Sequence, residues 1–278
     1  MRGSRRSLRG SVLIGCTLLA ATLVAGASRA DDITPRSVPE FRLLVIGGQK
    51  ARWTIPAGGL PTIVSYAFLQ ERSEFPGARN CDAMLPPEAA LSRSSISMSD
   101  FRSEVRAAFS AWEQAANIVF KETSSISEAG ILIGADAKAR GRAFTNVALH
   151  KKGATTNVPE AGSTDAIRQS LICLNPEKPW KIGFNGNLDV YDLRFTVTHE
   201  IGHAIGLDHP SPEGQLMSFR YVEKGRGLQA GDVAGAVALY GRKGLGPSQQ
   251  ADRTDAVPPP ALAGASAFGL GENAGSDR

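Results

Sequence analysis

Hydrophobic and polar positions divide the chain into a leader, one globular region and a tail. Residues 11–27 are almost continuously apolar and follow an arginine-rich start, which is the order typical of a secretory signal, and the small residues of SRA predict cleavage after Ala30. From Gly244 onward, Gly, Pro, Ala and Ser dominate without any hydrophobic period, which predicts a disordered tail. The expected limits are 1–30 for the signal, 31–48 for a short lead, 49–243 for one folded domain and 244–278 for the tail.

Within the folded domain, the hydrophobic patterns predict three helices and five strands. Apolar residues recur every three or four positions over 97–117, and further helices are expected from Leu193 and over 232–241. Residues 70–97, with clusters of Gly, Pro and Ser, predict a long irregular loop. The strands are expected in the second half of 52–69 and over 117–122, 130–137, 141–150 and 170–175.

The leader also indicates where the protein goes. SRRSL resembles a twin-arginine export signal, while LIGC, which ends at Cys16, resembles a lipobox whose cysteine would carry lipid. Most of the apolar run follows Cys16, which is the wrong side for lipoprotein cleavage. No later stretch is long enough to cross a bilayer. We therefore expect a soluble product, secreted or periplasmic, without a membrane anchor.

Removal of the leader changes the charge of the protein. The leader holds five arginines and no acidic residue, so the 31 basic and 27 acidic residues of the whole chain become 26 and 27. The mature chain then has a net charge of about −1, and the basic character belongs to the targeting segment. This composition favours neither a nucleic-acid partner nor an anionic membrane, and we expect a monomer.

The mature chain keeps two cysteines, Cys81 and Cys173, because Cys16 leaves with the signal. In an oxidising compartment this pair predicts one disulfide between a loop and the apolar strand SLICLN. Two unrelated buried thiols are the alternative reading.

Three of the four histidines lie within HEIGHAIGLDH, at residues 199–209. If Asp192 caps a helix here, His199 and His203 project side by side from one face because four residues separate them. The other face of that helix carries an apolar stripe that we expect to contact the core: Leu193, Val197, Ile201, Ala204 and Ile205.

A third ligand and a base complete this pattern. Gly206 can adopt a positive φ, which ends the helix and lets His209 return to the same ion. Three neutral imidazoles with one open position are typical of a catalytic zinc site, whereas a structural site fills all four positions. Glu200, next to the first ligand, can take a proton from the attacking water and pass it to the leaving amine. The pattern predicts one zinc ion as cofactor and hydrolysis of an amide.

The motif and its surroundings resemble a known family. HEIGHAIGLDH matches all five defining positions of HExxHxxGxxH, the signature of the metzincin zinc metalloproteases. LMSFRY is similar to the Met-turn of that clan, and LQAGDVAGAVALYG resembles the last helix of the matrixins. The resemblance covers about residues 50–243. It implies an α+β fold of the zincin type, with a twisted, mixed five-stranded sheet that has one antiparallel edge strand, packed on two long helices, plus a C-terminal helix.

The resemblance also implies roles for further residues. Met217 would form an apolar floor beneath the metal ligands, Asp232 would anchor the Met-turn, and Tyr221 would stand on the wall of the primed-side specificity pocket. The substrate would be a polypeptide in extended conformation, bound along the edge strand by strand addition. A Ca²⁺ ion is compatible with the clan, but no acidic loop has a recognisable calcium-ligand spacing.

The chain also departs from its relatives. Pro210 follows the third histidine where matrixins typically carry Ser, and Phe219 stands where serralysins place a zinc-approaching Tyr. The structural zinc site of matrixins uses three further histidines, and only His150 is left over. We therefore expect no second zinc site in that form and regard His150 as an exposed residue at a strand end.

The interpretation favoured by the sequence is a secreted zinc metalloendopeptidase. Two other classes stay open: a zinc-stabilised binding module without turnover, and a zinc hydrolase that acts on a non-protein amide. Glu200 argues against the first, because a non-catalytic module has no physical need for that carboxylate. The second differs only in its substrate cleft, which the sequence does not define.

Overall fold

The computed structural model describes residues 40–138, 141–150, 164–211 and 213–244. The predicted signal, with Cys16, and residues 245–278 of the predicted tail lie outside this part of the chain. None of the helices in the described part is long and apolar enough to cross a membrane.

Five strands form the centre of a nine-stranded sheet, in the order β7-β4-β8-β10-β9. The first four run parallel, and β9 runs antiparallel to β10 at the edge. This is the mixed sheet with one antiparallel edge strand that the resemblance to the metzincins implies. The bounds are Thr62–Phe68 for β4, Ile118–Glu122 for β7, Ile131–Asp136 for β8, Ala143–Leu149 for β9 and Thr164–Leu174 for β10.

β10 extends further upstream than the predicted 170–175. Its first half, TDAIRQ, is polar in sequence and carries no apolar run. It nevertheless pairs with β3 at residues 164–166 and with β9 from Ile167 onward. Pairing with two neighbours, rather than hydrophobic pattern, makes this segment a strand.

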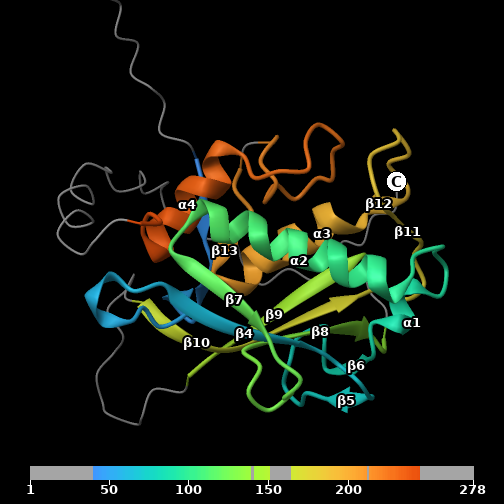
Figure 1. Cartoon of the computed structure of the whole chain (residues 1–278), viewed down its shortest axis with the longest axis horizontal. Coiled ribbons are helices and arrows are strands. Elements are labelled where there is room, and N and C mark those ends of the chain that lie inside the picture. Colours follow the sequence, from blue (N-terminus) through green and yellow to red (C-terminus); the bar gives the residue numbers. More distant parts are fainter. Residues whose placement is uncertain (1–39, 139–140, 151–163, 212, 245–278) are drawn as a thin grey trace, which may run out of the picture. The chain divides into compact units, whose positions relative to one another are not determined.

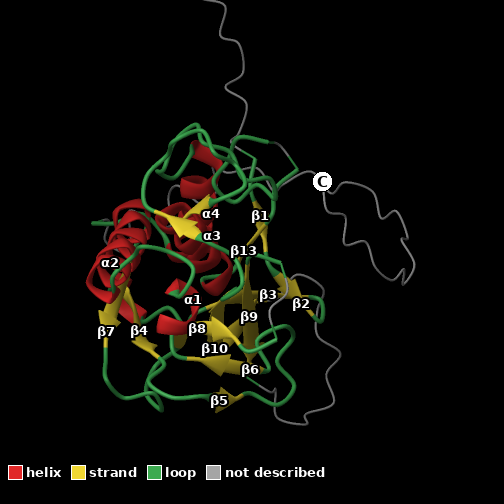
Figure 2. Cartoon of the chain, turned by 90° about the vertical axis from the view of Figure 1, so that its right-hand side faces the viewer, coloured by secondary structure: helices red, strands yellow, loops and turns green. Residues whose placement is uncertain are grey.

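The helices lie on one side of the sheet (Figures 1 and 2). In the first long helix the Ser97 side chain caps the start by accepting a hydrogen bond from Asp100 N at 3.1 Å, and its apolar stripe is buried. The indole of Trp112 donates a hydrogen bond to Thr198 O at 2.9 Å, which fixes this helix against the one that carries the histidines. The helix bounds are Glu88–Leu91 for α1, Met98–Ala115 for α2, Leu193–Ala204 for α3 and Ala230–Tyr240 for α4.

Residues 70–97 are more ordered than the predicted loop. They contain the short strands β5 (Ser73–Glu74) and β6 (Ala83–Leu85) and helix α1, and β6 pairs with β8. Met84 is fully buried and packs with Leu132 and Leu171 in a second, smaller core. The expectation of an irregular loop was wrong because AML, a short apolar run between turn residues, adds to the central sheet.

The predicted lead over 31–48 differs from the structure as well. Its described part forms β1 (Arg42–Leu43) and β2 (Val45–Ile46), which are followed by β3 (Gln49–Arg52). β1 pairs antiparallel with β13 (Leu207–Asp208), the segment that leads to His209. Residues upstream of the expected domain start at 49 therefore pair with a strand inside the expected domain. Two-residue strands have too short a pattern to be recognised in the sequence.

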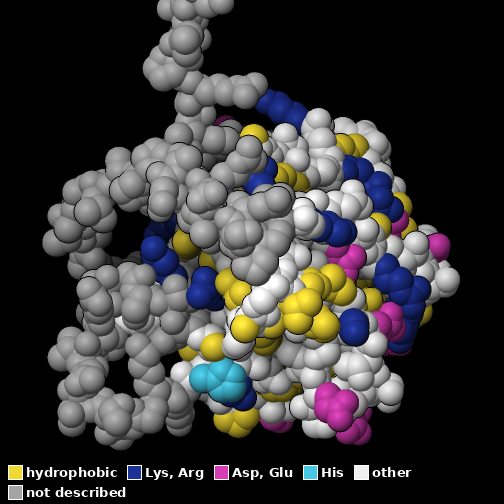
Figure 3. All heavy atoms as spheres, turned by 60° about the vertical axis from the view of Figure 1, so that its left-hand side comes forward, with side chains coloured by type: hydrophobic (Ala, Val, Ile, Leu, Met, Phe, Trp, Pro, Cys, Tyr) yellow, Lys and Arg dark blue, Asp and Glu magenta, His cyan; other side chains and the backbone are white. Residues whose placement is uncertain are grey.

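The remaining short elements flank the cleft and the N-terminal strands. They are the 3-10 helix η1 (Ala57–Gly59) and the strand pair β11 (Trp180–Lys181) and β12 (Tyr191–Asp192). On the face of the described residues seen in Figure 3, basic side chains are interspersed with acidic ones rather than gathered in one continuous patch.

A disulfide joins Cys81 to Cys173 of β10, across 92 positions of the sequence. It ties the segment over 70–97 to the strand next to the sheet edge. Both residues are buried, at 0% and 1% exposure. The alternative of two unrelated thiols does not describe this structure.

Replacement of both cysteines, Cys81→Ser together with Cys173→Ser, should lower the free energy of unfolding by about 2–5 kcal/mol, because the crosslink restricts a long loop of the unfolded chain. Urea unfolding with and without a reductant measures this. The reductant should destabilise the natural chain and leave the double variant unchanged. Equal stability of both proteins under oxidising conditions would contradict the prediction.

Candidate metal centre

Helix α3 begins at the residue expected to cap it. The Asp192 carboxylate accepts hydrogen bonds from Phe195 N at 2.8 Å and from Gly183 N at 2.6 Å. Arg226 donates to both oxygens of the same carboxylate, at 2.8 and 3.1 Å. Asp192 is fully buried, so the start of the helix is tied to two loops that border the cleft.

Both faces of α3 are covered. The predicted apolar stripe is fully buried, from Leu193 to Ile205. The opposite face is also shielded, and Glu200 exposes only 6% of its surface. Thr145 of β9 contacts this face directly through a hydrogen bond to Glu200. The sequence pattern predicts the first face and gives no indication of what covers the second.

Gly206 makes the turn that brings the third histidine back. Its φ is +106°, and a Cβ added there would lie 2.1 Å from Ala51 O. Two constraints therefore require glycine: the left-handed backbone and the close approach of β3. The chain then runs through β13 to His209.

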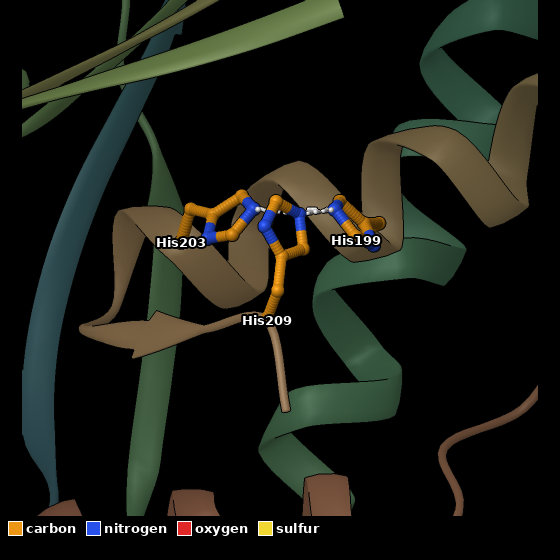
Figure 4. A group of neighbouring side chains, drawn as sticks. All are labelled: His199, His203 and His209. Atoms are coloured by element: carbon orange, nitrogen blue, oxygen red, sulfur yellow. Dashed lines mark hydrogen bonds between the residues drawn. The ribbon is translucent and has the colours of Figure 1, made fainter. Parts of the chain in front are cut away.

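The three histidines converge on one point (Figure 4). The Nε2 atoms of His199, His203 and His209 lie 3.0–3.1 Å from one another. Behind them, Nδ1 of His199 lies 2.8 Å from Leu216 O, and Nδ1 of His203 lies 2.8 Å from Leu207 O. These carbonyls can only accept, so both Nδ1 atoms donate and both Nε2 atoms present lone pairs.

This donor set fits a zinc ion. Tetrahedral zinc with Zn–N bonds of about 2.0–2.1 Å separates its nitrogen ligands by about 3.3 Å, close to the observed spacing. Among the residues that the structure describes, these three are the one group of three or more His, Cys, Asp or Glu side chains that could share a metal. No comparable carboxylate group there supports the calcium ion that the sequence analysis left open.

Burial keeps these imidazoles neutral. It lowers the pKa of His199, and it lowers that of His203 well below the usual range, with the neighbouring His199 and His209 adding to the effect. Burial and the proximity of His199 lower the pKa of His209 to about 4. Neutral imidazole is the form that binds metal, so the site is ready for an ion at neutral pH.

The Met-turn supports the histidines from below. Asp232 accepts hydrogen bonds from Leu216 N at 2.9 Å and from Met217 N at 3.0 Å. A Cβ on Gly202 of α3 would lie 2.2 Å from Met217 Sδ, so the thioether sits directly against the helix turn between the two ligands. Asp232 thus holds the turn whose Leu216 carbonyl orients His199.

Glu200 lies beside the metal ligands in a protected position. The Thr145 hydroxyl donates a hydrogen bond to Glu200 Oε2 at 2.7 Å. Burial raises the pKa of Glu200 to about 7, and the hydrogen bond from Thr145 opposes that rise. A carboxylate with such a pKa can both accept and return a proton near neutral pH.

The cleft above the histidines has a volume of about 460 Å³. Tyr221 stands on its wall, stacked on Tyr191 at 4.1 Å between ring centroids and edge-on to Phe195 at 5.0 Å. The Tyr221 hydroxyl accepts a hydrogen bond from Asp192 N and donates one to Glu223 Oε1, both at 2.9 Å. The residue expected on the pocket wall is therefore held rigidly there.

Residues that the sequence analysis did not single out also shape the cleft. Leu44, Arg142 and Thr145 contribute to its lining. The loop after the Met-turn is fastened by Arg226, which donates to Glu104 at 2.9 Å, while Arg194 makes two hydrogen bonds of 2.7 Å to Glu104. These contacts join segments more than 80 residues apart in the sequence, and no local sequence pattern predicts them.

Two residues discussed from the sequence are not among the metal ligands. His150 is exposed directly after β9, as expected. Phe219 is 85% exposed at the rim of the cleft, with its ring 5.3 Å from that of His209. A phenyl ring cannot ligate a metal, so it offers the site only an apolar surface.

Comparison with known proteins identifies the family. Residues 89–241 match the sequence profile of the matrixins, the M10 peptidases. The chain belongs to the matrixin family. This matrixin is 30% identical over 151 residues to metalloendoproteinase 1-MMP of Arabidopsis thaliana, covering 52% of the chain and 39% of that relative.

Two further relatives show the same pattern. Identity is 27% over 217 residues to metalloendoproteinase 4-MMP of Arabidopsis thaliana, covering 76% of this matrixin and 55% of that protein. It is 28% over 170 residues to human matrix metalloproteinase-19, covering 59% and 28%. The chain thus spans about half or less of the length of these relatives. Membership of the family implies zinc as the metal of the histidine site.

Gly206→Ala should destabilise the fold and weaken zinc binding, because both the backbone conformation and the contact with Ala51 O become unfavourable. Strain of this kind costs about 1–3 kcal/mol, and the clash adds to it. Unfolding with and without zinc, together with zinc content, measures the effect. Gly214→Ala is the matched control, since Gly214 has a φ of +96° but no atom within 4 Å of an added Cβ. Equal losses in both variants would show that the contact with β3 is unimportant.

The metal-free protein should lose stability as the pH falls from about 6.5 toward 4. In the unfolded chain the three histidines titrate near the ordinary pKa of 6.5. In the folded protein their pKa values are lower, and that of His209 is about 4, so the unfolded chain binds more protons in this pH range. Glu200 opposes this trend, because its folded pKa of about 7 exceeds its ordinary value of 4.5. The combined effect of the three histidines on the free energy of unfolding should exceed the opposing effect of Glu200. Urea unfolding after chelation at several pH values tests the sign, and a stability that rises toward pH 5 would refute it.

Proposed function

We propose that this matrixin is a secreted zinc metalloendopeptidase. The observation that carries the proposal is the position of Glu200, a buried carboxylate that lines the same cleft as His199, His203 and His209. A site that served only to hold a metal would gain nothing from this carboxylate, whose burial is unfavourable in the charged state.

The residues divide the chemistry between them. His199, His203 and His209 would hold a zinc ion, which when bound would supply a Lewis acid for the scissile carbonyl and the attacking water. Glu200 accepts the proton of that water and then delivers it to the nitrogen of the departing amine. The pKa of Glu200, about 7, suits both transfers at neutral pH.

The proposed substrate is a polypeptide in extended conformation. β9 borders the cleft, and among the described strands it pairs only with β10, which leaves its other edge available for strand addition. The aromatic walls at Tyr221 and Phe195 would receive one substrate side chain. We propose secretion because the leader has the order of a signal, and the disulfide suits an oxidising compartment.

The experiment compares hydrolysis of casein by the purified zinc-loaded chain with hydrolysis by Glu200→Ala. Removal of the general base should lower kcat by about 10²–10⁴-fold. Glu213→Ala is the matched control, because Glu213 is an exposed glutamate that pairs with the exposed Arg220 at 3.7 Å. Zinc content, measured by mass spectrometry, must be equal in all three proteins.

Each outcome decides between the classes of protein. Cleavage by the natural chain and by Glu213→Ala, with loss in Glu200→Ala, supports the peptidase. Full zinc content without cleavage of casein or of a peptide library would reject the peptidase in favour of a binding module. Release of fragments from peptidoglycan alone would move the function to a non-protein amide.

A further inference from the structure

We propose that Thr145 is a positioning residue, whose hydroxyl holds the Glu200 carboxylate in the orientation that proton transfer requires. The inference rests on the proposed function and adds a residue to its machinery. It concerns a side chain of the edge strand, whereas the metal ligands and Glu200 all come from α3 and the segment that follows it.

The Thr145 hydroxyl contacts both the side-chain carboxylate and the backbone carbonyl of Glu200. Thr145 Oγ1 lies 2.7 Å from Glu200 Oε2 and 3.0 Å from the backbone oxygen of the same residue. A hydroxyl has one hydrogen to donate, and the shorter, charge-assisted bond goes to the carboxylate. The hydrogen bond to Oε2 therefore ties the carboxylate to Thr145 of β9.

Little else fixes this carboxylate in the described part of the chain. Thr145 is the side chain that hydrogen-bonds to it there, and Glu200 is 94% buried. A glutamate side chain has a soft terminal torsion, so its oxygens rotate unless a partner holds one of them. With Oε2 engaged by Thr145, Oε1 is left as the oxygen that can accept the proton of the attacking water.

The position of Thr145 in the sheet gives the contact a second consequence. Thr145 pairs with Ile172 of β10, and its side chain reaches α3 while the outer edge of β9 is free of described strands. A substrate that adds to that edge would lie alongside the residue that holds the base.

The test uses three variants. Thr145→Val keeps the shape and removes the hydroxyl, Thr145→Ser keeps the hydroxyl, and Thr198→Val is the control. Thr198 is a buried threonine of α3 whose hydroxyl donates a hydrogen bond to Arg194 O, at 2.7 Å. We expect Thr145→Val to lower kcat by about 10–100-fold, since a displacement of 1 Å in a catalytic group costs up to about 10²-fold. Its KM and its zinc content should stay within about twofold of the natural chain.

Rescue of kcat by serine at position 145 distinguishes a positioning role of the hydroxyl from a packing role of the side chain. Thr145→Ser should recover kcat to within about fivefold, and Thr198→Val should retain it fully. If Thr145 only filled space, Val would be the better replacement and Ser the worse. Natural kcat in Thr145→Val, or a rise in KM with kcat unchanged, would overturn the inference.

A readout without turnover completes the design. In metal-free protein, Thr145→Val, Glu200→Ala and the double variant form a cycle in which the shifts of the urea midpoint should not add, because both changes remove the same contact. Additive shifts would overturn the contact itself. If the natural chain cleaves no substrate, the proposed function and the role of Thr145 fall together. If it cleaves and Thr145→Val equals it, only the role of Thr145 falls.

Discussion

The mutual approach of three unprotonated imidazole nitrogens is the constraint on which the rest of this structure depends. Lone pairs that face one another at 3.0–3.1 Å repel unless a cation lies among them, so the protein must hold each ring from behind. Two backbone carbonyls do this for His199 and His203. The third ring, on His209, depends instead on the placement of its chain segment, which β1 and Gly206 control.

Each of these supports comes from a distant part of the chain. The turn that orients His199 is held by Asp232, the backbone of Ala51 leaves no room for a side chain at the bend before His209, and Glu200 accepts a hydrogen bond from Thr145. The metal ligands lie close together in the sequence, but the residues that orient them do not. Substitutions far from the motif therefore act on the centre through geometry, without touching any ligand.

This division explains what the sequence could predict. The cap at Asp192, the ligand spacing and the glycine bend obey rules that operate within one helix and its end, and the structure has all three. The five central strands follow from apolar runs of sufficient length. β1 and β13 are two residues each, and the strand character of the polar first half of β10 depends on its neighbours. Thr145 is an ordinary polar residue in an alternating strand, and only its partner across the cleft distinguishes it.

The disulfide has a consequence for any cleavage of the chain between its two cysteines. Every residue from 82 to 172 lies between Cys81 and Cys173, and that stretch includes α2, β7, β8 and β9. A single cut anywhere within it divides the polypeptide into two pieces that remain covalently joined. The piece with the histidines then cannot diffuse away from the piece that carries the start of the sheet. A nicked molecule would migrate as one species until it is reduced, so self-cleavage in this region would not by itself disperse the site.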